Sequence, residues 1–192
     1  MRTFVAVEMD AAICTVLTTL IRELAASAAD VRWVNPKNIH LTLKFLGNIR
    51  DEDIPRAAKI VDDSLKGLSP FEIEVKGLGA FPSAGSPRVI WVGCEESGAN
   101  LEEIHKALDE KFASLGVKME TRKFHSHITL GRARSKRNIQ PLCRDIAGWS
   151  DLEIGSQLVN EVLLMESRLG PTGAVYSVVH TSPLKGKGGG KR

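Results

Sequence analysis

Hydrophobic and polar residues alternate with two different periods along the chain. Short runs in which every second residue is apolar predict β-strands, because successive side chains of a strand face opposite sides of a sheet. Longer runs in which apolar residues recur every three or four positions predict amphipathic helices. The predicted strands are residues 3–8, 31–34, 39–46, 71–75, 88–93, 118–120, 125–131, 161–168 and 175–181. The predicted helices are residues 10–27, 51–68, 100–115 and 140–147.

Turn and capping residues support these boundaries. Asp10 is a suitable N-cap for the first helix, and Gly116 follows the third. The sequence from Gly170 to Gly173 favours a tight turn between the last two strands. Strands and helices alternate, with additional hairpins, which predicts the α+β class with a mainly antiparallel sheet. A Rossmann fold is disfavoured because no G-x-G-x-x-G sequence follows the first strand, and no Walker motif is present.

The composition is that of an ordinary globular protein, with 192 residues, 43% hydrophobic and 26% charged. No apolar run approaches the roughly 20 residues of a membrane-spanning helix. Because no secretory leader is visible either, we expect a cytoplasmic protein. Three widely separated cysteines, Cys14, Cys94 and Cys143, form no C-x-x-C pair and are expected to be buried structural thiols.

The net charge of +3 is unevenly distributed. The Gly/Lys-rich tail, residues 185–192, carries four cations and no acid, and we expect it to be disordered. Without it the remaining domain, residues 1–184, is nearly neutral, so it is not a general polyanion binder. A second concentration of charge lies between Thr121 and Arg144, a stretch with seven Lys or Arg residues and no Asp or Glu.

Two copies of a short motif stand out in the predicted strands. One reads His40-Leu41-Thr42-Leu43, and the other reads His127-Ile128-Thr129-Leu130. A single His-x-Thr sequence carries little information, but two copies, each in a predicted strand, indicate an internal repeat. The whole domain is therefore predicted to be one unit whose two halves contribute one strand each to a common site.

The period of a strand predicts which side chains share a face. His40, Thr42 and Lys44 are expected on one face, with Leu41, Leu43 and Phe45 on the opposite, core-facing side. In the second strand His125, His127 and Thr129 share the polar face, while Ile128 and Leu130 face the core. Two imidazoles and two hydroxyls would then meet across a cleft, arranged about a pseudo-twofold axis.

Such a set of side chains suits a phosphodiester. A neutral imidazole can take a proton from water, and an imidazolium can donate one to a leaving alkoxide. The hydroxyls of Thr42 and Thr129 can donate hydrogen bonds to phosphate oxygens. The nearest cation in the acid-free stretch is Arg132, whose guanidinium can form a fork-like contact with an anion.

The five histidines do not all have the same predicted role. A lone histidine in a strand is more often packed or solvent-facing than catalytic, and this interpretation is preferred for His105 and His180. His125 is a weaker candidate for substrate contact than His40 or His127. A zinc site formed by His40, His125 and His127 is disfavoured, because the second motif lies among cations and far in sequence from carboxylates. No metal and no cofactor is therefore predicted.

Three segments resemble the RNA 2′,3′-cyclic phosphodiesterases, also called 2′-5′ RNA ligases, of the two-histidine (2H) phosphoesterase superfamily. They are residues 33–47 and 124–132, which contain the two motifs, and residues 166–176 near the end of the domain. The resemblance covers nearly the whole chain except the tail. One departure is visible, because many relatives have proline where this chain has Ser126 between the two histidines of the second motif.

The resemblance implies a bilobal α+β fold, with two antiparallel sheets, outer helices and pseudo-twofold symmetry around a central cleft. It also implies metal-independent hydrolysis of a terminal RNA 2′,3′-cyclic phosphate to a 2′-phosphomonoester. By this resemblance His40 is the proton donor to the leaving 3′ oxygen, and His127 is the proton acceptor from water. Thr42, Thr129 and Arg132 would bind the phosphate.

Two other functions stay open at the level of sequence. One is the reverse reaction, a 2′-5′ ligation of a cyclic-phosphate end to a 5′-hydroxyl end, which microscopic reversibility assigns to the same residues. The other is a non-catalytic RNA-end binder, which has no need of two matched proton-transfer groups. RNA with a cyclic phosphate end is the expected partner, no membrane is involved, and a monomer is expected because the repeat already supplies both sides of the site.

Overall fold

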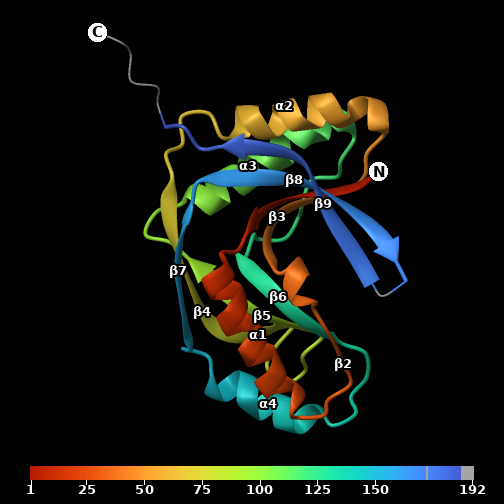
Figure 1. Cartoon of the computed structure of the whole chain (residues 1–192), viewed down its shortest axis with the longest axis vertical. Coiled ribbons are helices and arrows are strands. Elements are labelled where there is room, and N and C mark those ends of the chain that lie inside the picture. The colour runs from red at the N-terminus through yellow and green to blue at the C-terminus, as the bar shows by residue number, and fades with distance from the viewer. Residues whose placement is uncertain (172, 187–192) are drawn as a thin grey trace.

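The computed structural model describes residues 1–171 and 173–186, which form a mixed α/β fold with a curled antiparallel sheet and flanking helices (Figure 1). Its strands are β1 (Arg2–Glu8), β2 (Val31–Trp33), β3 (His40–Asn48), β4 (Phe71–Phe81), β5 (Val89–Glu95), β6 (His127–Ala133), β7 (Glu153–Val159), β8 (Glu161–Gly170) and β9 (Gly173–Pro183). Its α-helices are α1 (Ala11–Ala25), α2 (Ile54–Ser64), α3 (Asn100–Phe112) and α4 (Ile139–Gly148). Short 3₁₀ turns are η1 (Pro36–Asn38), η2 (Asp51–Asp53) and η3 (Ala113–Leu115).

The strands belong to one continuous sheet with the order β7-β4-β5-β6-β3-β1-β8-β9, in which β2 pairs with β6. The family resemblance implied two antiparallel sheets. The structure has one continuous sheet instead, because β3 pairs with β6 through Leu41 and Ile128. The two strands that carry the motifs are therefore neighbours at the centre of the sheet. Every pairing recorded along the sheet is antiparallel, as the sequence predicted.

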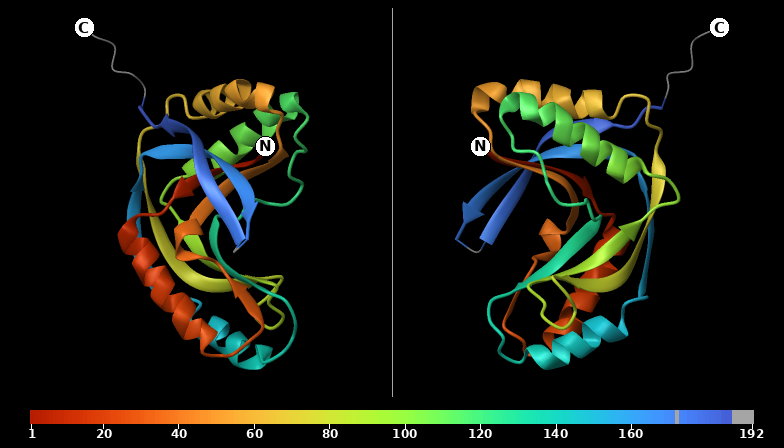
Figure 2. Two further views of the ribbon diagram at one scale, coloured as in Figure 1. Left: turned by 45° about the vertical axis from the view of Figure 1, so that its right-hand side comes forward. Right: turned by 180° about the vertical axis from the view of Figure 1, so that it is seen from behind.

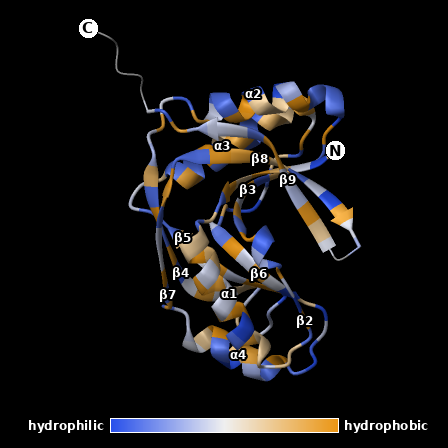
Figure 3. Cartoon of the chain, in the orientation of Figure 1, coloured by the Kyte–Doolittle hydropathy of each residue, from blue (hydrophilic) through white to orange (hydrophobic). Residues whose placement is uncertain are grey.

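Helices cover the outer side of the curled sheet, and its concave side is open. The views in Figure 2 place α2 and α3 against one end of the sheet and α1 and α4 against the other. Each helix packs through a stripe of apolar residues, such as Ile13, Leu17, Leu20 and Leu24 of α1, which are all buried. These stripes join the buried sheet residues in one hydrophobic core, and Figure 3 shows polar and apolar positions mixed along the same helices.

Each motif strand contains a β-bulge at the fourth residue of its motif. Val5 pairs with Lys44 and Ala6 with Thr42, so Leu43 is the extra residue of β3. In the same way Ile90 pairs with Gly131 and Trp91 with Thr129, so Leu130 is the extra residue of β6. A bulge reverses the alternation of faces for the residues that follow it. Both motif strands therefore change phase directly after their His-x-Thr sequence.

Some predicted elements differ from those observed. Residues 118–120, predicted as a strand, form a connecting loop, because their backbone groups bond to the side chains of Lys44 and Asp109. β7 was not predicted, since its pattern includes the positive-φ residue Gly155 and exposed positions on both faces. β4 continues to Phe81, through a bulge at Gly77. The predicted helices 10–27, 51–68, 100–115 and 140–147 are observed as α1, η2 with α2, α3 with η3, and α4.

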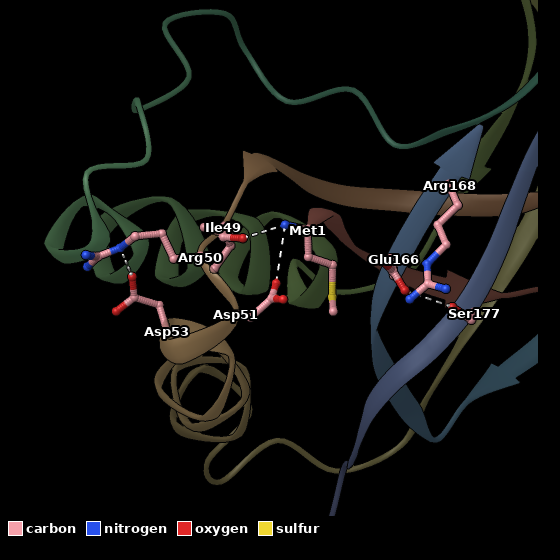
Figure 4. A network of polar contacts seen from close by, with 8 residues as sticks. All are labelled: Met1, Ile49, Arg50, Asp51, Asp53, Glu166, Arg168 and Ser177. Atoms are coloured by element: carbon pink, nitrogen blue, oxygen red, sulfur yellow. Dashed lines mark hydrogen bonds and ion pairs between the residues drawn. The ribbon is translucent and has the colours of Figure 1, made fainter.

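Polar contacts hold the first residues of β1 beside the end of β3 (Figure 4). The amino group of Met1 donates to the carbonyl of Ile49 at 2.8 Å and lies 3.5 Å from Asp51. On the other side of β1, Glu166 of β8 is buried and accepts from Arg168 at 2.8 Å. The contacts of Met1 fix the start of β1, whose residues 2–4 line the cleft on the concave side of the sheet.

The chain end is described only in part. Gly186 donates its backbone N–H to Leu68 at 2.8 Å, so the first residues of the predicted tail are hydrogen-bonded to the domain. The expected disorder of residues 187–192 concerns positions that lie outside the described part of the chain. No helix within residues 1–171 and 173–186 is long and apolar enough to cross a membrane.

Candidate active site

A cleft of about 810 Å³ lies on the concave side of the sheet. It is lined by the start of β1, by residues of the 32–38 segment, by β3 and β6, and by the β8–β9 hairpin. Among the predicted site residues, His40, Thr42, Thr129 and Arg132 line this cleft. His127 is not among the lining residues, although it begins the same strand as Thr129 and Arg132. The fold thus brings both motifs together at the centre of the sheet.

His40 is held by a hydrogen bond and two aromatic rings. Its Nδ1 lies 2.7 Å from the backbone carbonyl of Asn38. Since a carbonyl only accepts, Nδ1 carries the proton and Nε2 is the free nitrogen of the neutral ring. The ring packs against Phe4 at 4.9 Å and edge-on against Tyr176 at 5.3 Å. Burial lowers the pKa of His40, and the bond to Asn38 opposes this effect.

His127 repeats this arrangement in the second motif. Its Nδ1 lies 2.7 Å from the backbone carbonyl of His125, which fixes the same tautomer. Its ring packs edge-on against Phe81 at 5.1 Å and lies 6.1 Å from Trp91. Burial lowers the pKa of His127, the bond to the His125 carbonyl opposes this effect, and Coulombic interactions with His125 and Arg132 lower the pKa further. In both motifs the residue two positions before the histidine therefore sets which nitrogen is free.

The two threonines lie on the same side of the sheet as the histidines. Leu41 and Ile128 are fully buried and form the pair that joins the strands. The residues on either side of Leu41 and Ile128 point to the other face of the sheet. Because the strands are antiparallel, Thr42 lies opposite His127 and Thr129 lies opposite His40. Each of the two strands therefore contributes an imidazole and a hydroxyl to the same face of the sheet.

The cleft favours an anion. Its cationic lining residues are Arg2, Arg32, Lys37 and Arg132, and among the described residues that line it there is no Asp or Glu. Opposite charges attract strongly where the surrounding walls exclude water. A negatively charged ligand is therefore the chemistry that this surface accepts best.

Two predicted orientations in β3 are wrong. Phe45, expected on the core face, is 63% exposed and lines the cleft, whereas Lys44, expected beside His40 and Thr42, is only 5% exposed. The bulge at Leu43 is the reason, because it shifts the alternation by one residue. Arg132 follows the bulge at Leu130 and so holds in β6 the position that Phe45 holds in β3.

Several residues at the site were not singled out from the sequence. Asn38 contributes its carbonyl to His40, and its side chain donates to the carbonyl of Ala174 at 2.8 Å, which links the first motif to the β8–β9 hairpin. Tyr176 of that hairpin contacts His40. One feature of the sequence pointed to Asn38: it stands two positions before His40, as His125 stands two positions before His127.

The remaining histidines have defined surroundings. His125 packs its ring against Trp91 at 4.7 Å and Phe81 at 5.4 Å, and it does not line the cleft. His105 of α3 bonds to the carbonyl of Leu43, and His180 bonds to Asp62 at 2.9 Å. In the part of the chain that the structure describes, no three His, Cys, Asp or Glu side chains are grouped as metal ligands.

Ser126 separates His125 from His127, and hydrogen bonds fix its backbone. Its hydroxyl donates to the carbonyl of Cys94 at 2.6 Å, and the N–H of Cys94 donates to the Ser126 carbonyl at 3.0 Å. Cys94 is buried, which raises the pKa of its thiol to about 12 and makes the thiol inert. The two bonds give this position a rigidity that a proline ring would otherwise supply.

Comparison with known proteins identifies relatives over almost the whole chain. The family described as LigT like Phosphoesterase matches residues 7–91 and again residues 92–176, so that each match contains one motif. The RNA 2′,3′-cyclic phosphodiesterase of Methanothermobacter thermautotrophicus is 35% identical over 176 residues, which is 92% of this chain and 95% of that relative. The protein of the same name from Thermotoga maritima is 30% identical over 187 residues, covering 97% of both chains.

Solved structures show the same fold. The Thermus thermophilus protein TT0787 superimposes with a TM-score of 0.80 at 26% identity, covering 97% of this chain and 100% of that one. The E. coli LigT structure, complexed with 3′-AMP, has a TM-score of 0.74 at 24% identity and covers 95% of this chain and 97% of that one. The curled sheet with its flanking helices is therefore a known architecture.

Proposed function

The chain belongs to the LigT-like phosphoesterase family, and we propose that it hydrolyses the 2′,3′-cyclic phosphate at the end of an RNA strand to a 2′-phosphomonoester, without a metal ion. The relatives named for this activity cover most of the chain. The observation that carries the proposal is the pair of histidines that are each held in the same tautomer by a backbone carbonyl. Two proton-transfer groups with matched free nitrogens suit a reaction that needs one acid and one base.

The proposed reaction begins with a water molecule at the phosphorus. Neutral His127 accepts a proton from this water through Nε2, and the water oxygen forms a bond to phosphorus. The bond from phosphorus to the 3′ oxygen breaks, and protonated His40 donates the proton that the departing 3′ alkoxide needs. The phosphate stays on the 2′ oxygen, and the two histidines end with exchanged protonation states. Proton exchange with solvent then restores both.

Charge that develops on the phosphate oxygens is stabilised by the lining of the cleft. Thr42 and Thr129 donate hydrogen bonds from the two strands, and Arg132 contributes its guanidinium. This assignment of roles rests on the position of these residues beside His40 in a cleft of cationic character. His125 acts through its backbone carbonyl on His127 rather than as a ligand of the substrate.

We further infer that the two halves of the molecule are related by a pseudo-twofold axis between β3 and β6. The strand order supports this inference, because β5 and β4 follow β6 outward as β1 and β8 follow β3. The matched bulges at Leu43 and Leu130 support it as well. Each half then supplies one lobe of the cleft.

The test of this function uses a short RNA with a 2′,3′-cyclic phosphate end and the protein in excess chelator. We expect a 2′-phosphate product, separated chromatographically from the 3′-phosphate. Product that forms only after a metal is added back would contradict the mechanism. A second reaction with an added RNA carrying a 5′-hydroxyl end tests ligation, because a longer product can form only by the reverse chemistry. Binding without any turnover would favour an RNA-end binder.

The pH dependence follows from the histidines of the free protein. Burial lowers the pKa of both His40 and His127 from the usual value of 6.5. The base must be neutral, so activity falls below its pKa, and the acid must be protonated, so activity falls above its pKa. We therefore expect a bell-shaped profile of kcat/KM with its maximum below about pH 6.5. A maximum of kcat/KM well above neutral pH would contradict this expectation.

A further inference from the structure

Helix α3 contacts the first motif strand and the connector that leads into the second, from the side of the sheet opposite the cleft. Its residue His105 donates from Nδ1 to the carbonyl of Leu43, the bulge residue of β3, at 2.7 Å. The same imidazole stacks on Phe124, with ring centroids 4.3 Å apart and an angle of 13° between the planes. In the rear view of Figure 2, α3 lies in front of the sheet and the connector to β6 runs down from its end. One side chain therefore contacts the segments of both motifs.

The contact with Phe124 lies next to a group that the site depends on. Phe124 directly precedes His125, and the carbonyl of His125 accepts the Nδ1 hydrogen of His127. A stack between flat rings restricts how Phe124, and with it the following peptide, can turn. His105 of α3 is therefore connected to the His127 ring through two contacts, its stack on Phe124 and the hydrogen bond between the His125 carbonyl and His127.

The other anchors of this connector lie on either side of that contact. Ser126 is bonded to Cys94 of β5 through its hydroxyl and its carbonyl, which fixes the peptide that follows Ser126. Further back, Lys44 donates to the carbonyl of Lys118, and Asp109 accepts from the N–H of Glu120 at 3.0 Å. Between Glu120 and Ser126 the described residues form no regular secondary structure. The ring of His125 itself packs against Trp91 and Phe81. The His105–Phe124 stack is the contact that ties the connector to α3 directly before the His125 peptide.

We propose that His105 is a positioning residue, which holds the His125 carbonyl against Nδ1 of His127 by stacking on Phe124. The proposal rests on the proposed function for its kinetic consequence, but its structural content is independent of activity. Loss of the stack lets the peptide of His125 turn, and the Nδ1 hydrogen bond of His127 weakens. The neutral ring then divides between its two tautomers, and a smaller fraction presents Nε2 as the proton acceptor.

Two substitutions separate the two contacts of His105. His105→Asn keeps an N–H donor in reach of the Leu43 carbonyl and removes the stacked ring. His105→Phe keeps a ring over Phe124 and removes the donor. If the stack positions His127, the Asn variant is affected and the Phe variant is not. His180→Asn is a matched control, because His180 contacts Asp62 at the far end of the sheet and neither motif.

The primary measurement is the nitrogen NMR spectrum of His127, which reports its tautomer and its pKa without any substrate. For His105→Asn we expect a mixture of tautomers and a lower pKa, because the bond to the His125 carbonyl raises the pKa of His127 in the intact protein. His105→Phe and His180→Asn are expected to keep the spectrum of the unchanged protein. An unaltered His127 in a folded His105→Asn variant would overturn the proposal, as would equal changes in both His105 variants.

The kinetic measurement on RNA with a cyclic phosphate end is a second readout. His105→Asn is expected to lower kcat about tenfold with little change in KM, because a smaller share of the base is in its active tautomer. A general loss of folding would instead lower the concentration of active protein in both His105 variants. If the unchanged protein does not hydrolyse the RNA, the proposed function fails, and the NMR comparison still decides the role of His105.

Discussion

Replacing His127 with alanine is expected to lower kcat by about 10²–10⁴-fold, and replacing His40 with alanine is expected to have an effect of similar size. Each substitution removes one of the two groups whose tautomers are fixed by a backbone carbonyl. Water is the only remaining base or acid, and it is poorly matched to either proton transfer. The measurement is single-turnover hydrolysis of RNA with a 2′,3′-cyclic phosphate end.

The pH profiles of the two variants distinguish the two roles. The residual activity of His127→Ala is expected to lose its decline at low pH, because no base remains to be protonated. That of His40→Ala is expected to lose its decline at high pH, because no acid remains to be deprotonated. His180→Ala serves as the control and is expected to keep both limbs, since His180 bonds to Asp62 away from the cleft. Full activity in either active-site variant would remove that histidine from the mechanism.

The placement of the two motifs on one face of the sheet could be predicted from the sequence because it is encoded locally. His40 with Thr42, and His127 with Thr129, each span only three residues, and the period of a strand places them on one face without knowledge of the fold. Their apolar neighbours Leu41 and Ile128 are fully buried, as the pattern indicated. The motif itself determines that its His and Thr side chains share one face of a strand, and the fold then brings the two strands together.

The pattern failed where a bulge changed the period. Phe45 and Lys44 exchange their predicted faces because Leu43 is an extra residue in β3, and nothing in the local sequence marks this position. In the second motif the equivalent of Lys44 is Gly131, which has no side chain. A Cβ atom there would lie 2.7 Å from the ring of Trp33, so glycine is required by packing. Bulges depend on the partner strand, and partner strands cannot be read from a single segment.

Contacts between distant segments were the other source of error. Residues 118–120 have the composition of a strand, but their backbone groups bond to Lys44 and Asp109, which lie in other elements of the fold. His105 similarly shows no pattern of its own, and its contacts with Leu43 and Phe124 arise only when α3 packs behind the sheet. The strand propensity of a segment does not predict a loop whose backbone is hydrogen-bonded to side chains from other elements.

Breaking the buried ion pair between Lys44 and Asp109 is expected to cause the largest loss of stability. The two side chains are 4% and 9% exposed and contact each other directly. Lys44→Met leaves the Asp109 carboxylate buried, with the N–H of Glu120 as its remaining partner. Removing one partner of such a pair costs about 3–5 kcal/mol of unfolding free energy, since the other charge stays uncompensated. Urea unfolding of the variant and of the unchanged protein measures the difference.

A double variant tests whether the uncompensated charge is the cause. Lys44→Met combined with Asp109→Leu removes both charges, so it is expected to be more stable than Lys44→Met alone. The pH dependence of the unfolding free energy is an independent test of the same ion pair. Burial disfavours the charged form of Asp109, but its bonds from Lys44 and Glu120 outweigh this effect, and the pKa of Asp109 is lowered. The stability that it contributes is therefore present above the unfolded pKa of about 3.9 and is lost as the pH falls through the folded value. If the double variant is no more stable than Lys44→Met, packing rather than charge accounts for the loss.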